Sequence, residues 1–141
     1  MNTPVQKPNK PGIEPKPHTQ AFWEAANSDK LLYQYCLDCQ KPQFVPSSVC
    51  RKCHQKNLDW RESSGQGFVF TYSIIHRAPN AAFKDDTPYP IAMVDMAEGF
   101  RITANILNCP PERVYIGMPV RVVFETRDGS DYKIPQVEPA E

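Results

Sequence analysis

Four of the five cysteines form two C-x-x-C pairs that together could bind one metal ion. Ten residues separate the pairs, which is enough for a turn that lets each pair direct both sulfurs inward. Tetrahedral ligation by four thiolates favours zinc, with iron as the alternative. The predicted metal ligands are Cys36, Cys39, Cys50 and Cys53.

A site with four protein ligands is closed, since it keeps no position for a water molecule or a substrate oxygen. We therefore expect the metal to stabilise the fold rather than to catalyse a reaction. Disulfides are the weaker interpretation, because no other feature of the chain is typical of a secreted protein. His54 follows Cys53 directly and is not needed as a ligand. Four nearby bases would offset the negative charge of the thiolates: Lys41, Arg51, Lys52 and Lys56.

The rest of the chain shows no catalytic motif. No serine, cysteine or carboxylate is tied to His76 by a recognisable motif. The spare thiol Cys109 is followed by two prolines, which offer few hydrogen-bond donors to activate it. Gly65-Gln66-Gly67 precedes a predicted strand, whereas the dinucleotide-binding fingerprint follows a strand and opens a helix. We expect no catalytic machinery in this chain, so whether it belongs to an enzyme depends on a partner.

Length and charge limit the class of protein. The 141 residues carry 16 basic and 16 acidic side chains, so the formal net charge is zero. Proteins that bind phosphate backbones usually carry a basic excess, which makes nucleic acid an unfavoured partner. No apolar run has the length of a membrane span, and the first twenty residues lack the apolar core of a signal peptide. The sequence predicts a cytoplasmic protein.

Residues 1–18 contain five prolines interleaved with lysines, and such a segment forms neither helix nor regular sheet. We expect an extended tail. It is either a solvated leader or an arm that orders on a partner subunit.

Residues 19–64 are expected to form a short helix and a zinc ribbon. Thr19 is a plausible N-cap for a helix that ends at Asn27. A helix of two turns is too short to be stable alone, so it should dock through Phe22 or Trp23, and we predict these two residues as partner-docking candidates. Strands at 31–35 and 58–62 would flank the two cysteine pairs.

Residues 65–141 are expected to form an OB-fold. Strands are predicted at 68–75, 91–96, 100–106, 120–124 and 132–137, with a short helical turn within 109–119. Phe68, Phe70, Tyr72 and Ile74 should share one face of the first strand. Five short strands with a cap between the third and fourth follow the order of this Greek-key barrel. Pro135 requires the last strand to be an edge. The fold class is mainly β, with a short N-terminal helix, a rubredoxin-like zinc ribbon and a five-stranded OB-fold barrel.

The loop of residues 77–90 is the longest predicted stretch without strands in the second half. It joins the first two barrel strands, a position from which OB-folds often bind ligands. One interpretation is a surface for a partner or an amphipathic ligand, and the other is a proline-rich connector whose Phe83 packs on the barrel.

Several motifs together resemble those of the acyl-CoA-associated zinc-ribbon/OB-fold proteins, long catalogued as a domain of unknown function. The resemblance covers about residues 20–137 and lacks the proline-rich tail. Its motifs are Phe22-Trp23-Glu24, the four cysteines with Phe44 and Pro46 between them, Gly65-x-Gly67 with Thr71-Tyr72 and His76, Pro88-Tyr89-Pro90, Glu98-Gly99-x-Arg101, and Ile116-Gly117-Met118-x-Val120.

The resemblance implies a non-catalytic accessory subunit of a heteromeric acyl-CoA thiolase. Such a subunit would support assembly and CoA-thioester binding in a β-oxidation-like degradation pathway, with an aromatic compound as one candidate source of substrate. The residues that we predict to contact CoA or the partner are His76, Arg77, Phe83, Tyr89 and Arg101.

Two alternatives remain. The same scaffold could serve an enoyl-CoA hydratase. From another class, it could be a nucleic-acid-binding module, since zinc ribbons and OB-folds both occur there. The third predicted barrel strand offers only Arg101 as a base, which disfavours nucleic acid.

Overall fold

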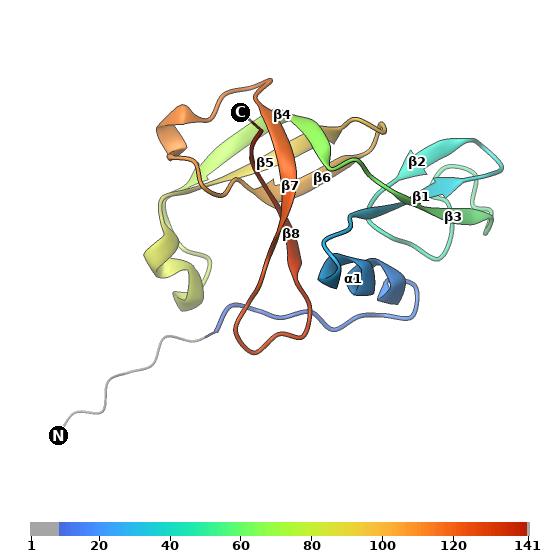
Figure 1. Ribbon diagram of the computed structural model, residues 1–141, viewed down its shortest axis with the longest axis horizontal. Coiled ribbons are helices and arrows are strands. Elements are labelled where there is room, and N and C mark those ends of the chain that lie inside the picture. The colour runs from blue at the N-terminus through green and yellow to red at the C-terminus, as the bar shows by residue number, and fades with distance from the viewer. Residues whose placement is uncertain (1–8, 141) are drawn as a thin grey trace.

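The computed structural model describes residues 9–140, so residues 1–8 of the tail predicted for residues 1–18 lie outside the described residues. A short helix and a three-stranded ribbon stand beside a five-stranded barrel (Figure 1). The predicted fold class is confirmed.

Helix α1 spans Gln20–Asn27 and follows Thr19 at the N-cap position. Phe22 and Ala26, four residues apart, are its buried residues and lie on one face. This face packs on the rest of the chain, so tertiary contacts rather than helix propensity hold two turns in place.

The ribbon is an antiparallel sheet in the order β2-β1-β3. Its strands are β1 (Leu32–Cys36), β2 (Lys41–Gln43) and β3 (Leu58–Glu62). The sequence predicted the central strand, as 31–35, and one outer strand, as 58–62, and missed the other outer strand, β2. Three residues with a proline at the centre give no alternation to detect, and β2 forms because the first cysteine turn folds Lys41 back opposite Cys36.

The barrel consists of β4 (Gln66–Ile75), β5 (Tyr89–Met96), β6 (Arg101–Asn105), β7 (Pro119–Glu125) and β8 (Ile134–Pro139). Its strand order is β6-β5-β4-β7-β8. Ile106 bridges to Val137, and the Leu107 amide donates to the Val137 carbonyl at 2.7 Å, which closes the barrel. The 3-10 turn η2 (Pro111–Arg113) lies between β6 and β7, where the cap was predicted.

A β-bulge in β4 changes which residues face the core. The sequence predicted one shared face for Phe68, Phe70, Tyr72 and Ile74. The register with β5 shifts between Val69 and Thr71, so two residues on β4 oppose one on β5. Beyond the bulge, Tyr72 pairs with buried Ala92. The single-face prediction is therefore wrong, because the extra residue moves the later side chains to the other face.

Gly67 explains how closely β4 and β5 approach. A Cβ atom there would lie 2.7 Å from the Asp95 carbonyl oxygen and 2.9 Å from a Val94 methyl. The Asp95 carbonyl oxygen belongs to the backbone of β5 and cannot move aside as a flexible side chain could. Only glycine therefore fits this position.

Aromatic side chains join the helix, the ribbon and the barrel in one core. The Phe22 ring lies 5.5 Å from that of Phe44, and the Phe44 ring lies 5.6 Å from that of Phe100. Tyr33 of the ribbon stacks on Phe100 at 4.6 Å. Such pairs contribute beyond the area that they bury, so the two sheets are held as one unit.

The loop predicted for residues 77–90 contains a 3-10 helix, η1 (Ala81–Asp86). The Asn80 side chain accepts a hydrogen bond from the Ala82 amide at 2.9 Å and caps η1. Ala82 is 2% exposed, and Phe83 is half-buried. The expectation of a stretch without regular structure is wrong, because local capping and burial of Ala82 order it.

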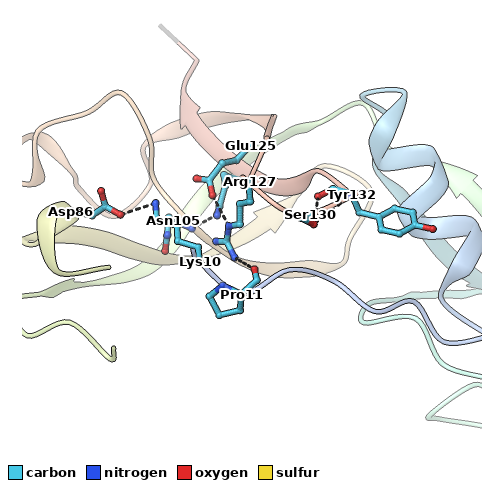
Figure 2. A network of polar contacts seen from close by, with 9 residues as sticks. Lys10, Pro11, Asp86, Asn105, Glu125, Arg127, Ser130 and Tyr132 are labelled. Carbon is cyan, nitrogen blue, oxygen red and sulfur yellow. Dashed lines mark hydrogen bonds and ion pairs between the residues drawn. The ribbon is translucent and has the colours of Figure 1, made fainter. Parts of the chain in front are cut away.

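The described part of the proline-rich segment lies on the chain's own barrel. Lys10 Nζ pairs with Asp86 at 2.7 Å, and the Arg127 guanidinium donates to the Pro11 carbonyl at 3.0 Å (Figure 2). The Arg127 side chain is 13% exposed and also pairs with Glu125 at 2.8 Å. Residues 9–18 thus connect η1 with the loop between β7 and β8.

No helix among the described residues is long and apolar enough to cross a membrane.

Glu98, in the turn between β5 and β6, holds the linker that joins the ribbon to the barrel. Its carboxylate accepts hydrogen bonds from Ser63 Oγ at 2.6 Å and from the Ser64 amide at 2.8 Å. Partial burial pushes the pKa of Glu98 up, but these hydrogen bonds outweigh it and hold the pKa below its ordinary value. The charged form of Glu98 therefore stabilises the folded chain.

We expect Glu98→Gln to lower the free energy of unfolding by about 1 kcal/mol at pH 7, a value that allows for partial solvent screening. Because the folded-state pKa is depressed, this contribution is present above the ordinary carboxyl pKa of about 4.3 and is lost as the pH falls through the folded-state value. Urea denaturation across pH checks it. The matched control is Glu62→Gln, at an exposed carboxylate of the ribbon. A Glu98→Gln deficit that is independent of pH would contradict the charge argument.

Candidate metal centre and binding surfaces

The four predicted sulfurs lie together. The Sγ atoms of Cys36, Cys39, Cys50 and Cys53 all fall within 4.8 Å of one another. Cys36 Sγ lies 3.5 Å from Cys53 Sγ, and Cys39 Sγ lies 3.7 Å from Cys50 Sγ. Zinc–sulfur bonds of about 2.3 Å in a tetrahedron put the sulfurs about 3.8 Å apart. The donor set and its spacing fit a zinc ion.

The two cysteine pairs form equivalent turns. In the first, the Gln40 amide donates to the Cys36 carbonyl at 2.9 Å, and in the second, the His54 amide donates to the Cys50 carbonyl at 2.9 Å. Gln40 and His54 both have positive φ, at 57° and 62°. The backbone thus reverses after each pair and aims its sulfurs at one point. His54 is exposed and serves the turn, while the four cysteines complete the site.

The thiols perturb one another strongly. Burial and then the neighbouring sulfurs raise the pKa of Cys39 to about 12. Backbone N–H groups of Cys53 and Lys52 lower the pKa of Cys50 to about 6. Sulfurs this close cannot all ionise without a cation between them, and backbone donors already favour one thiolate. A zinc ion would hold the cysteines as thiolates and fix the ribbon; the chain's part is to position the four sulfurs.

Gln34 positions the segment that carries the second cysteine pair. It is 4% exposed, and its amide donates to the Ser47 carbonyl at 2.8 Å and accepts from the Ser47 amide at 2.9 Å. Gln43 donates to Gln34 at 2.8 Å and accepts from the Arg51 amide at 3.0 Å. Sequence reasoning missed both glutamines. A polar residue inside an apolar strand run was the available signal for Gln34.

The predicted CoA or partner contacts are spread over three separate depressions. His76 and Arg77 line one of about 430 Å³. Phe83 and Tyr89, whose ring centroids lie 6.4 Å apart, line another of about 380 Å³. Arg101 lines a groove of about 240 Å³ between ribbon and barrel. The structure therefore does not bring the five residues into one site.

The two predicted docking residues differ in exposure. Phe22 is 3% exposed and belongs to the chain's own core, so a partner cannot reach it in this conformation. Trp23 is half-buried and packs against the Phe22 ring at 4.8 Å. The short helix finds its docking surface within the chain, which is why Phe22 is covered.

An apolar surface that sequence reasoning missed lies on the outer side of β4 and β5. Phe68, Phe70 and Met93 are 56%, 47% and 38% exposed. The Arg101 guanidinium lies 3.8 Å from the centre of the Phe70 ring. Tyr115 and Ile116, 50% and 67% exposed, lie on the loop whose Gly117 amide donates to the Val69 carbonyl of β4 at 2.7 Å. We call these five residues the outer apolar face: Phe68, Phe70, Met93, Tyr115 and Ile116.

The geometry agrees with comparisons to known proteins. The profile of the ChsH2 rubredoxin-like zinc ribbon domain matches residues 23–59, and that of the ChsH2 C-terminal OB-fold domain matches residues 60–125. A DUF35 domain-containing scaffold protein of Methanocaldococcus jannaschii is 40% identical over 117 residues, which cover 77% of this chain and 82% of the relative. The chain belongs to the ChsH2/DUF35 family.

Other relatives of this DUF35 chain carry names of enzyme subunits. A probable enoyl-CoA hydratase alpha subunit of Thermomonospora curvata is 33% identical over 139 residues. That match covers 96% of this chain but 42% of the relative, so this chain spans less than half of it. A solved structure titled Ltp2-ChsH2(DUF35) aldolase superposes with a TM-score of 0.79 at 30% identity. It covers 94% of this chain and 100% of the matched chain.

We expect the zinc-loaded chain to contain about one zinc per molecule and Cys36→Ser to lose most of it, because each closed site needs all four sulfurs. Folding and metal binding are coupled in such ribbons, so the melting temperature of Cys36→Ser should fall as well. Metal analysis by mass spectrometry and thermal unfolding measure the two effects. Cys109→Ser is the matched control, since its thiol lies outside the four-sulfur cluster. Full zinc retention in Cys36→Ser would refute the site.

Proposed function

We propose that this chain is a non-catalytic accessory subunit of an enzyme that acts on acyl-CoA thioesters. The observation that carries the proposal is the outer apolar face, whose five large apolar side chains are between 38% and 67% exposed. Contiguous apolar patches on proteins usually mark an interaction site. The names of related hydratase subunits and of the aldolase complex support an enzyme as the partner.

The outer apolar face has the chemistry of a protein-docking surface. Its residues combine aromatic rings, a methionine and one exposed isoleucine, and aromatic residues and methionine are enriched at interfaces. The charged side chains beside this face neutralise each other, because Arg101 Nε pairs with Asp95 at 2.7 Å. The partner surface that fits is apolar and near neutral.

Among enzyme partners, we favour a thiolase-type enzyme that makes or breaks a carbon–carbon bond next to the thioester. The relative named as an aldolase complex is covered over its full matched chain. The hydratase-named relative is covered over 42%, so its name rests partly on segments that this chain does not match. The thiolase-type partner would supply the catalytic cysteine and histidines. An enoyl-CoA hydratase is the second candidate.

Within this proposal, the zinc is structural and the partner holds the reacting carbon atoms. His76, Arg77, Phe83, Tyr89 and Arg101 are the proposed contacts to CoA or the partner, with Trp23 as a further docking contact. Because these residues line three separate depressions, some of them would contact CoA and others the partner. We place the complex in the cytoplasm, where thiols stay reduced and able to bind metal.

The position of residues 9–18 disfavours a nucleic-acid-binding function. OB-folds bind oligonucleotides between the loop that joins strands one and two and the loop that joins strands four and five. In this chain those loops contain η1 and residues 126–133, and Lys10 and Pro11 bind across both of them (Figure 2). The usual binding cleft is therefore bridged by the chain itself.

We expect the tagged wild-type chain, expressed in its native host, to co-purify with a thiolase-type or hydratase-type enzyme. Phe68→Asp combined with Ile116→Asp should reduce the recovered enzyme at least tenfold, because a buried unpaired carboxylate opposes docking. Mass spectrometry identifies and quantifies the enzyme.

Leu37→Asp combined with Val45→Asp is the matched control, since these ribbon residues are 54% and 58% exposed. It should leave recovery unchanged. If no acyl-CoA enzyme accompanies the wild type, the accessory-subunit proposal fails. If the control loses the enzyme and the barrel variant keeps it, docking occurs through the ribbon instead.

A further inference from the structure

A groove lies where the ribbon meets the barrel. It takes residues from β2, from the second cysteine turn and from the start of β6, and its volume is about 240 Å³. Pro42 approaches the turn between β5 and β6, where a Cβ atom on Gly99 would lie 3.6 Å from the Pro42 ring. The groove therefore exists only because the two sheets pack together.

The groove is strongly basic. Lys41, Arg51, Lys52 and Arg101 line it, and among its described lining residues none carries a carboxylate. Arg101 pairs with Asp95 at 2.7 Å, whereas Lys41, Arg51 and Lys52 form no ion pair within residues 9–140.

The metal site does not account for all of this charge. Four thiolates around a divalent ion leave two negative charges, and Asp95 adds a third beside Arg101. These are fewer than the four cations of the groove. Positive charge therefore remains for an anion. The Arg51 guanidinium also donates to the Val45 carbonyl, which fixes its direction.

The floor of the groove is apolar. Pro42 and Phe44 are half-buried, and the Phe100 ring lies 5.6 Å from that of Phe44. Arginine and lysine side chains bind phosphate oxygens, and an aromatic floor accepts a flat ring. This combination suits a nucleotide better than a carboxylate side chain, which has no ring to place.

The size of the groove limits how much of a ligand it can hold. Sites that enclose a whole ligand measure roughly 300–1,000 Å³. At about 240 Å³, this groove holds one end of a larger molecule. The remainder must lie elsewhere, as it would if a partner enzyme held the reacting end.

We propose that this groove binds the phosphate-bearing nucleotide end of the CoA thioester, with Lys41, Arg51 and Lys52 contacting its phosphates. This assignment rests on the proposed function for the identity of the ligand. It gives this chain the recognition of the nucleotide and leaves the acyl end to the partner enzyme.

Calorimetric titration of the full zinc-loaded chain with adenosine 3′,5′-bisphosphate tests the proposal. We expect saturable binding that Lys41→Gln combined with Lys52→Gln weakens at least tenfold, because two phosphate contacts are removed. The matched control is Lys30→Gln combined with Lys56→Gln, which removes the same charge from two exposed lysines outside the groove. The control should bind like the wild type. Zinc content verifies that each variant is folded.

Three results would overturn the proposal: no saturable binding to the wild type, equal weakening in both double variants, or displacement of the bisphosphate by an equimolar hexaglutamate peptide. The last result would assign the groove to an acidic protein segment. Co-purification of the partner enzyme is scored separately. If the enzyme is captured but the bisphosphate does not bind, the groove assignment alone fails. If the bisphosphate binds but no enzyme is captured, the accessory-subunit function fails.

Discussion

The convergence of four sulfurs within 4.8 Å is the constraint on which the rest of the molecule depends. The ribbon has three short strands and few buried apolar residues, so it cannot rely on a large core of its own. Two equivalent turns aim the thiols at one point, and a bound zinc ion would convert their mutual repulsion into attraction. The Gln34 and Gln43 amides then hold the intervening segment in place.

The fixed ribbon presents Tyr33 and Phe44 to the barrel. Both rings pack on Phe100, and Phe22 of α1 joins them, so the metal site and the barrel share one core. The linker between the sheets is held in addition by Glu98. A change in the position of the sulfurs would therefore alter the basic groove, because both the ribbon and the barrel contribute residues to its walls.

The surfaces of the barrel differ from those of an OB-fold whose binding cleft is open. The cleft from which OB-folds bind oligonucleotides is bridged by residues 9–18, through Lys10 and Pro11. Large apolar side chains are exposed on the outer side of β4 and β5. Phe70, at the bulge of β4, is one of these side chains, and Arg101 lies over its ring. A ring covered by an arginine stays in a defined orientation, which is useful for a docking surface.

The sequence by itself determined the elements whose signals are local. The C-x-x-C spacing identified the four cysteines that converge, period-two alternation located the barrel strands, and a short apolar run after Thr19 located α1. Only the tertiary structure decided how surfaces are used. Whether Phe22 is buried or Phe70 is exposed depends on which segments pack against them, and a bulge or a three-residue strand has no periodic signal. The basic groove combines β2, a cysteine turn and β6, which are far apart in the chain, so no local pattern could have predicted it.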